Sequence, residues 1–378
     1  MKKQGIKIVV DPQIFDDQLY GGISRYYIEI LSRQEKKGNK ITIPILTSRN
    51  FYIRQSIFYN KKQQIVDLFI KVMNRYKVNT NTFIDKQKKK ELNRAFTSDY
   101  DVLVPTYFNP YFYEQIGNKP FVLTVYDMIY ELFPDLFIDD PHNVVANKLF
   151  LIEKATKIIA VSNNTKKDIL KLYPHIDESK IEVIYHGNSI KVEKNIDIKL
   201  PENYILYVGS RWHYKNFTFL VDAVKDILDE NDDLILLCAG GGDFNEEEKA
   251  LIHDLDLDDK IVQQKFEDFE LGHYYKNALC FVFPSMYEGF GIPVLESMAC
   301  GCPIVLSNSS SFPEVAGEAG IFFNLGDKQD LQNKIRMLLN NDLLRAEYSQ
   351  KGLIQVKNFD WDDAAEKCLE VYIEAVNS

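Results

Sequence analysis

The stretch FVFPSMYEGFGIPVLESMACGCP, from Phe281 to Pro303, contains the most informative local pattern in this chain. Its apolar start indicates a short buried strand at Leu279–Phe283, and a loop with two glycines follows. Pro293 predicts the start of a helix, because proline is tolerated in a first helical turn, where its missing N–H would have no partner. A strand, a glycine loop and a helix make the unit from which parallel α/β sheets are built.

Two glutamates in this stretch are candidate site residues. Glu288 lies in the loop and Glu296 lies one turn inside the predicted helix, with seven residues between them. Gly289 and Gly291 let the backbone approach a ligand and direct amides at it, and the free N–H groups of the helix start favour an anion. This combination indicates a site for a nucleotide sugar. The alternative is a solvated surface, since glutamate pairs at this spacing are common in helical proteins.

The motif E-G-F-G-I-P-V-L-E and the following M-A-C-G-C-P-I-V, together residues 288–305, closely resemble the donor-site signature of family 4 glycosyltransferases. These are retaining enzymes with two Rossmann-like domains. The resemblance covers nearly the whole chain, and its most specific motifs lie in the C-terminal half. It implies the α/β GT-B fold, in which the parallel sheets of two Rossmann-like domains face a central cleft.

The resemblance also implies roles for residues of this motif. Glu288 would face the donor sugar and the positive charge that develops at its anomeric carbon. Glu296 would accept hydrogen bonds from the ribose hydroxyls of the nucleotide. The amides near Gly289, Phe290 and Gly291 would contact the sugar and the phosphate.

A second motif, YVGSRWHYKN at residues 207–216, places two cations after a predicted buried strand. Arg211 and Lys215 at the end of such a strand are suited to bind a diphosphate, although ordinary surface charges are the alternative. The loop is similar to the family pattern from Gly209 to Asn216, whose basic pair holds the donor pyrophosphate. Positive charge placed in advance near a leaving diphosphate lowers the barrier to transfer. We find no credible metal-ligand cluster, and the resemblance likewise implies a metal-independent enzyme without a cofactor.

The N-terminal half carries weaker signals. Gly22 follows a predicted strand and matches the family's N-domain glycine loop, whose amides face the donor phosphate or the acceptor. Many relatives carry His-Asp where this chain has Tyr126 and Asp127, the two residues that we assign to the catalytic site beside Glu288. A tyrosine cannot shuttle protons near neutral pH without a large pKa shift, whereas a role of the backbone carbonyl would survive. His186 is expected to be a structural histidine, with a polar contact to the cleft as the alternative.

The alternation of strands and helices predicts two domains. We expect an acceptor-side domain at 1–190, a linker at 191–203 and a nucleotide-sugar-binding domain at 204–358. In the resembled family the last helix, here within 359–378, crosses back to the first domain. One early strand is expected at Ile41–Leu46.

Charge is unevenly distributed along the 378 residues, whose net charge is −10. The acidic total argues against a nucleic-acid partner. Residues 51–100 nevertheless hold eleven Lys/Arg against four Asp/Glu, which predicts either peripheral contact with an anionic membrane or a solvated helical hairpin. The five scattered cysteines and the lack of an apolar run of ~18–20 residues indicate a cytoplasmic protein.

These observations favour a retaining glycosyltransferase with a nucleotide-sugar donor and a saccharide or lipid-linked saccharide acceptor, acting in surface polysaccharide synthesis. Overall resemblance suggests GDP-mannose as the donor. Two alternatives stay open. One is a catalytically silent GT-B scaffold subunit, and the other is a phosphorylase or epimerase of the same architecture.

Overall fold

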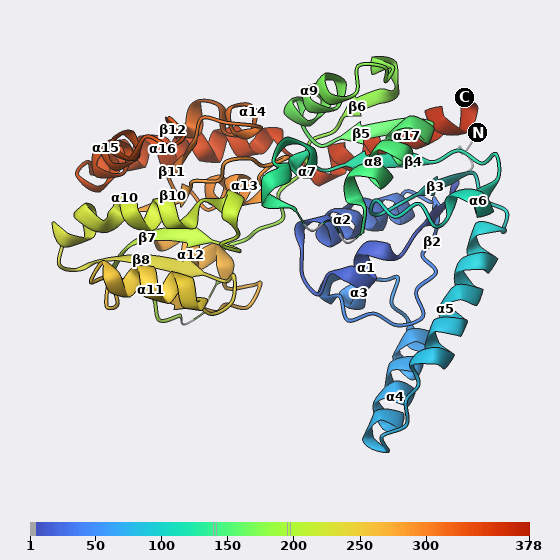
Figure 1. The fold of residues 1–378 in the computed structure, drawn as a ribbon. Helices are drawn as coiled ribbons and strands as arrows, with labels where there is room; N and C mark the ends of the chain where they lie inside the picture. The colour runs from blue at the N-terminus through green and yellow to red at the C-terminus, as the bar shows by residue number, and fades with distance from the viewer. Residues whose placement is uncertain (1–4, 139, 141, 195, 197) are drawn as a thin grey trace. The chain divides into compact units, whose positions relative to one another are not determined.

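The computed structural model describes residues 5–138, 140, 142–194, 196 and 198–378. The chain divides into two compact units, one formed by Met1–His186 with Trp361–Ser378 and the other by Gly187–Asp360. Residues 195 and 197 of the predicted linker lie outside the described residues. Each unit is an α/β structure with parallel strands (Figure 1), which confirms the predicted fold class.

The first unit contains two three-stranded parallel sheets, in the orders β2-β1-β3 and β4-β5-β6. A parallel bridge between Leu103 and Phe121 connects them. The strand predicted at Ile41–Leu46 ends early, at Thr42, and the nearby Pro44 has no N–H to donate to a ladder. The strands are β1 (Lys7–Val10), β2 (Lys40–Thr42), β3 (Val102–Val104), β4 (Val122–Val125), β5 (Lys157–Ala160) and β6 (Ile181–Val183).

The first and last long helices of this unit, α2 (Gly22–Lys36) and α17 (Trp361–Asn377), pack against each other. The Arg33 guanidinium donates to the Asp362 carboxylate at 2.7 Å, and the Gln34 side-chain amide donates to the Ala365 carbonyl. The other α-helices of the unit are α1 (Gln13–Asp17), α3 (Phe51–Gln55), α4 (Lys61–Arg75), α5 (Asn81–Phe96), α6 (Tyr113–Ile116), α7 (Ile129–Leu132), α8 (Val144–Lys154) and α9 (Asn163–Leu172).

The second unit is built on one six-stranded parallel sheet with the order β12-β11-β10-β7-β8-β9. This is a doubly wound sheet, in which the strand order reverses between β7 and β10. The strands are β7 (Asn203–Val208), β8 (Leu234–Ala239), β9 (Ile261–Gln264), β10 (Cys280–Phe283), β11 (Ile304–Ser307) and β12 (Gly320–Phe323).

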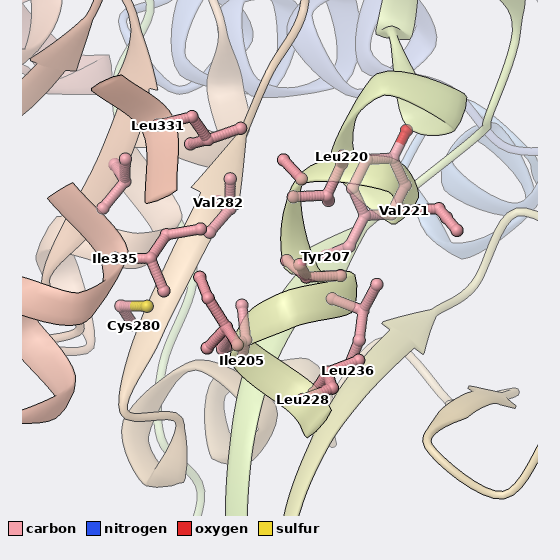
Figure 2. Packing of buried hydrophobic residues seen from close by; sticks show 14 of the residues in the cluster. Ile205, Tyr207, Leu220, Val221, Leu228, Leu236, Cys280, Val282, Leu331 and Ile335 are labelled. Carbon is pink, nitrogen blue, oxygen red and sulfur yellow. The ribbon is translucent and has the colours of Figure 1, made fainter. Parts of the chain in front are cut away.

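Helices pack on both faces of this sheet because alternate residues of a strand point to opposite sides. Ile205 and Tyr207 of β7 belong to a buried cluster with side chains of α10 and α15 (Figure 2). On the other face the Tyr204 hydroxyl donates to the Tyr274 carbonyl of α12 at 2.7 Å. The helices are α10 (Phe217–Asp229), α11 (Glu246–Asp254), α12 (Leu271–Asn277), α13 (Ile292–Ala299), α14 (Phe312–Ala316), α15 (Lys328–Leu339) and α16 (Asp342–Gln355).

Candidate functional site

The loops after β7 and β10 meet at the point where the strand order of the second unit reverses. The two strands are hydrogen-bonded neighbours, and their following loops leave the same edge of the sheet. The Met286 amide donates to the Tyr214 carbonyl at 2.8 Å, and Lys215 Nζ donates to Glu288 Oε1 at 2.5 Å. The structure thus brings together two predicted site residues where open α/β sheets bind their ligands.

The Lys215–Glu288 pair is largely shielded from water. The Lys215 side chain is 16% exposed and that of Glu288 is 15% exposed. Lys215 Nζ lies 4.9 Å from the centroid of the Tyr214 ring and 5.6 Å from that of Phe283. Charges in such a setting act more strongly on a ligand than charges in open water. Lys215 thus offers a compact cation that can bind a phosphate, and Glu288 offers a carboxylate that can stabilise positive charge.

Serines after β11 hold the loop that carries Glu288. Ser310 Oγ accepts the Glu288 amide hydrogen at 3.0 Å, and Ser311 Oγ donates to the Glu288 carbonyl at 2.9 Å. These serines were not predicted as site residues, although the run SNSSS at 307–311, which begins on the last residue of β11, was a usable signal. Two more serines hold the start of the loop, with Ser307 donating to Ser285 O at 2.6 Å and Ser309 donating to Met286 O at 3.0 Å.

The residues between Glu288 and α13 are buried. Gly289 is buried, and the Phe290 ring contacts the Phe359 ring with their centroids 5.9 Å apart. Gly291 has a φ of 92°, and a Cβ there would lie 3.1 Å from the Phe312 ring, so this position requires glycine. The backbone therefore turns sharply into the helix directly after Glu288.

Glu296 lies inside α13 and is only 5% exposed. It accepts a hydrogen bond from the Tyr275 hydroxyl at 3.3 Å. Burial, together with the charge of Glu296, raises the pKa of Tyr275 well above its usual value, so this hydroxyl stays protonated and remains a donor. Tyr275, like the serines after β11, was not predicted from the sequence.

Arg211 makes different contacts from Lys215. Its guanidinium donates to Glu248 at 2.9 Å, to the Gly240 carbonyl at 3.3 Å, and to the carbonyls of Gly242 and Asp243 at 3.0 Å each. The side chain is 3% exposed. In this structure Arg211 holds the glycine loop after β8 to α11, and only Lys215 of the two predicted cations contacts Glu288.

Two predicted residues of the first unit follow β4. Tyr126 is buried, and its hydroxyl donates to the Thr106 carbonyl at 3.4 Å. Burial raises the pKa of Tyr126 well above its usual value, so its hydroxyl stays protonated near neutral pH. Asp127 Oδ1 accepts the Ile129 amide hydrogen at 3.1 Å.

A fully buried lysine, which the sequence analysis missed, supports Asp127. Lys148 Nζ donates to the Asp127 carbonyl at 3.1 Å and to Glu131 Oε2 at 2.9 Å. Burial raises the pKa of Glu131, with the ammonium acting in the opposite direction. Nothing in the sequence distinguishes Lys148 from an ordinary helical lysine. The carbonyl of Asp127 therefore already has a cationic partner in this structure.

The remaining predicted residue, Gly22, is exposed and begins α2. The Ser24 hydroxyl donates to the carbonyl of the preceding Gly21 at 3.0 Å. His186, by contrast, is buried between aromatic rings, with its centroid 4.9 Å from that of Tyr26 and 5.6 Å from that of Trp361. Its position is that of a structural histidine.

Across the residues that the structure describes, no group of three or more His, Cys, Asp or Glu side chains is placed to hold a metal ion.

Two family models match the chain and together cover most of it. The model "Glycosyltransferase Family 4" matches residues 20–190, and "Glycosyl transferases group 1" matches residues 189–355.

Curated relatives carry similar sequences. The O-antigen chain mannosyltransferase RfbU of Salmonella typhimurium is 33% identical over 57% of this chain and 59% of its own length. The O-antigen chain mannosyltransferase B of Escherichia coli is 25% identical over 70% of this chain and 73% of its own. The present chain thus covers less than two thirds of the first relative.

Solved structures share the fold. Sucrose-phosphate synthase from Thermosynechococcus elongatus superposes with a TM-score of 0.73 at 18% identity, over 98% of each chain. WaaG, a glycosyltransferase involved in lipopolysaccharide biosynthesis, superposes with a TM-score of 0.68 at 16% identity, over 96% of this chain and 99% of its own. These likenesses confirm the predicted GT-B fold. The two family models, which together match residues 20–355, show that this chain belongs to the family 4, group 1 glycosyltransferases.

Proposed function

We propose that this protein transfers a sugar, with retention of configuration, from a nucleotide-sugar donor to a saccharide or lipid-linked saccharide in surface polysaccharide synthesis. The observation that carries the proposal is the Lys215–Glu288 pair at the carboxyl ends of β7 and β10. A doubly wound sheet binds nucleotides at this position. A cation and a carboxylate there match the two charges that separate when a glycosyl diphosphate bond breaks.

The pair suggests how the reaction would proceed. An arriving diphosphate would draw the Lys215 ammonium away from Glu288, and the ammonium would then stabilise the charge of the departing diphosphate. Glu288, released from its partner, would face the anomeric carbon as positive charge develops there. Both groups would stabilise the transition state more than the ground state, which is the requirement for faster turnover.

The other predicted residues have supporting roles in this proposal. Glu296 would bind the ribose hydroxyls through its carboxylate, oriented by Tyr275. The backbone from Gly289 to Gly291 would contact the sugar and phosphate. Arg211 would stabilise the loop at the donor site through Glu248, and it would reach the diphosphate only by leaving its present contacts.

GDP-mannose is the proposed donor, because both relatives named above are mannosyltransferases. Lys215 supplies positive charge where many transferases use a divalent ion, so we propose metal-independent transfer. We further propose a cytoplasmic enzyme without a nucleic-acid partner, which reaches an anionic membrane through its basic residues 51–100.

A thermal-shift screen of nucleotide sugars tests donor binding. A ligand at ~100 times its dissociation constant stabilises a protein by roughly 2.7 kcal/mol, so GDP-mannose should raise the melting temperature. Lys215→Ala should reduce the shift, whereas the matched control Lys249→Ala, which changes an exposed lysine of the same unit, should keep it. A panel that produces no shift would contradict the proposal.

Product analysis tests the chemistry. NMR of the isolated product should show the anomeric configuration of the donor, and the reaction should continue in excess EDTA. An inverted linkage would contradict retention. Loss of activity in EDTA that manganese restores would contradict metal independence.

A further inference from the structure

The helix α4 has its apolar side chains on the outside. Ile65, Leu68, Phe69 and Val72 are 67%, 61%, 44% and 44% exposed, and Tyr76 just after the helix is 73% exposed. Their spacing of three and four residues places them on one helical face, here called the α4 stripe. Exposed Val78 and Phe83 extend the apolar surface across the turn into α5.

Polar groups, in contrast, hold the opposite face of α4 to the first unit. The Gln63 side-chain amide donates to the Ile45 carbonyl at 3.1 Å. Asp67 accepts hydrogen bonds from the Thr47 hydroxyl at 2.5 Å and from the Tyr59 hydroxyl at 2.7 Å. A surface helix of a globular protein normally turns its apolar face to the core, so α4 has the reverse orientation.

The helices α4 and α5 form a basic hairpin, residues 61–96, which extends from the rest of the first unit (Figure 1). An ion pair between Lys62 and Glu91 at 3.0 Å joins them. Asp67 is bonded as described, and Asp85 is the remaining acid of the hairpin. Eight exposed cations form no ion pair with any described residue, namely Lys61, Lys71, Arg75, Lys77, Lys86, Lys89, Lys90 and Arg94.

We propose that α4 lies in the interface of an anionic bilayer, with the α4 stripe among the acyl chains and the basic residues at the headgroups. A helix with one apolar face and a Lys/Arg-rich polar face binds membranes in this way, with its apolar side about 5–10 Å deep. The α4 stripe would then be the surface through which the proposed transferase binds the membrane. The membrane contact rests on the proposed function only in one respect, namely that a lipid-linked acceptor would lie in the same membrane.

The charge of the hairpin favours a membrane over a second copy of this chain. Two copies joined through the α4 stripe would bring two strongly basic surfaces together, and juxtaposed like charges are unfavourable. An anionic lipid surface attracts the same residues. No helix in the described ranges is long and apolar enough to cross a bilayer, so the proposed contact is with the interface alone.

Co-sedimentation of the full chain with vesicles tests the proposal without any donor or acceptor. The vesicles are phosphatidylcholine with about one third phosphatidylglycerol, compared with pure phosphatidylcholine. We expect binding to the anionic vesicles that falls as salt rises, since exposed charges are screened over about 8 Å at physiological ionic strength. Equal binding to both vesicles, or binding to neither, would overturn the proposal. Because no sugar nucleotide is present, this outcome is independent of catalysis.

Paired variants separate the stripe from the charges. Leu68→Ser with Phe69→Ser should weaken binding by at least about tenfold, whereas the matched pair Leu343→Ser with Ile354→Ser, at exposed positions of the second unit, should not. Lys71→Gln with Arg75→Gln should weaken it by about fivefold per charge. The control pair Lys249→Gln with Lys367→Gln should have no effect.

Two results would refute the role of the α4 stripe. One is unchanged vesicle binding by Leu68→Ser with Phe69→Ser, which would leave electrostatics as the only attraction. The other is sedimentation velocity showing a dimer that this pair of substitutions dissociates, which would identify a second copy as the occupant. A Phe69→Trp variant provides a direct readout, since its emission should shift to the blue on anionic vesicles, whereas that of Leu343→Trp should not.

Discussion

Replacing Glu288 by glutamine should lower turnover without weakening the binding of a nucleoside diphosphate. Glutamine keeps the shape of the side chain but removes its charge. It therefore removes half of the ion pair that Lys215 Nζ forms with Glu288 Oε1 at 2.5 Å. The proposed mechanism requires that charge only when the glycosidic bond breaks.

The size of the binding effect follows from this geometry. A diphosphate has to draw Lys215 away from a carboxylate that also repels it. A hydrogen bond between charged groups contributes about 1.5–3 kcal/mol and a neutral one about 0.5–1.5 kcal/mol. Replacing the charged hydrogen bond between Glu288 and Lys215 by a neutral one therefore makes Lys215 easier to draw away by about 1 kcal/mol. The dissociation constant of the diphosphate should therefore stay the same or fall, by up to about fivefold.

Turnover should fall because the group that faces the developing positive charge is lost. Removing one preorganised charge-stabilising group typically costs about 10²–10³ in turnover. Calorimetry with GDP and UDP measures binding, and initial rates with saturating donor measure turnover. Glu246→Gln is the matched control, since this glutamate is 91% exposed in the same unit, and it should change neither quantity.

The role assigned to Glu288 would be refuted if Glu288→Gln lost about tenfold or more in diphosphate affinity while turnover stayed near that of the unmodified protein. Glu288 would then be a binding residue, and the ion pair with Lys215 would not compete with the ligand.

Other expected outcomes follow from single residues. Lys215→Ala should lower turnover by about 10²–10³ and weaken diphosphate binding, measured by initial rates and calorimetry. Glu248→Gln should lower the free energy of unfolding by about 3–5 kcal/mol in urea denaturation, because it leaves the buried Arg211 guanidinium without a counter-charge. Burial raises the pKa of Asp11 to about 6, so the stability that its protonated form contributes is lost as pH rises through 6. The difference in free energy of unfolding between Asp11→Asn and the unmodified protein should therefore shift by about 1.4 kcal/mol in favour of the variant from pH 5 to pH 7.5. Burial lowers the pKa of His186 to about 3, so protonation of the unfolded chain destabilises the fold as pH falls below 6.5. His186→Gln should remove that loss of stability at acid pH. A variant whose free energy of unfolding falls between pH 7 and pH 4 as much as that of the unmodified protein would contradict this expectation.

The elements around the site could be predicted because buried parallel strands are short apolar runs between glycines and helix starts. The strand predicted at Leu279–Phe283 is β10, and the helix predicted near Pro293 is α13. The end of β2 was predicted less well. The expected strand continued to Leu46, while the ladder ends at Thr42.

The contacts within the site could not be predicted in the same way. The pairing of Lys215 with Glu288 depends on β7 lying beside β10, which is a property of strand order and not of local pattern. The sequence placed Arg211 and Lys215 on the same loop. The Arg211 side chain nevertheless turns away from Lys215 to its partner Glu248, which lies on α11, 37 residues further along the chain. Lys148 gave no signal because a buried lysine is recognisable only from its surroundings.

The packing of α17 on α2 has a consequence for hybrid enzymes made from two relatives. The chain enters the second unit at Gly187 and leaves it after Asp360, and its last helix then belongs to the first unit. A simple exchange of C-terminal halves would pair α2 of one parent with α17 of the other and mismatch contacts such as Arg33 with Asp362. Hybrids should therefore exchange residues 187–360 as an internal cassette and keep both ends of the chain from a single parent.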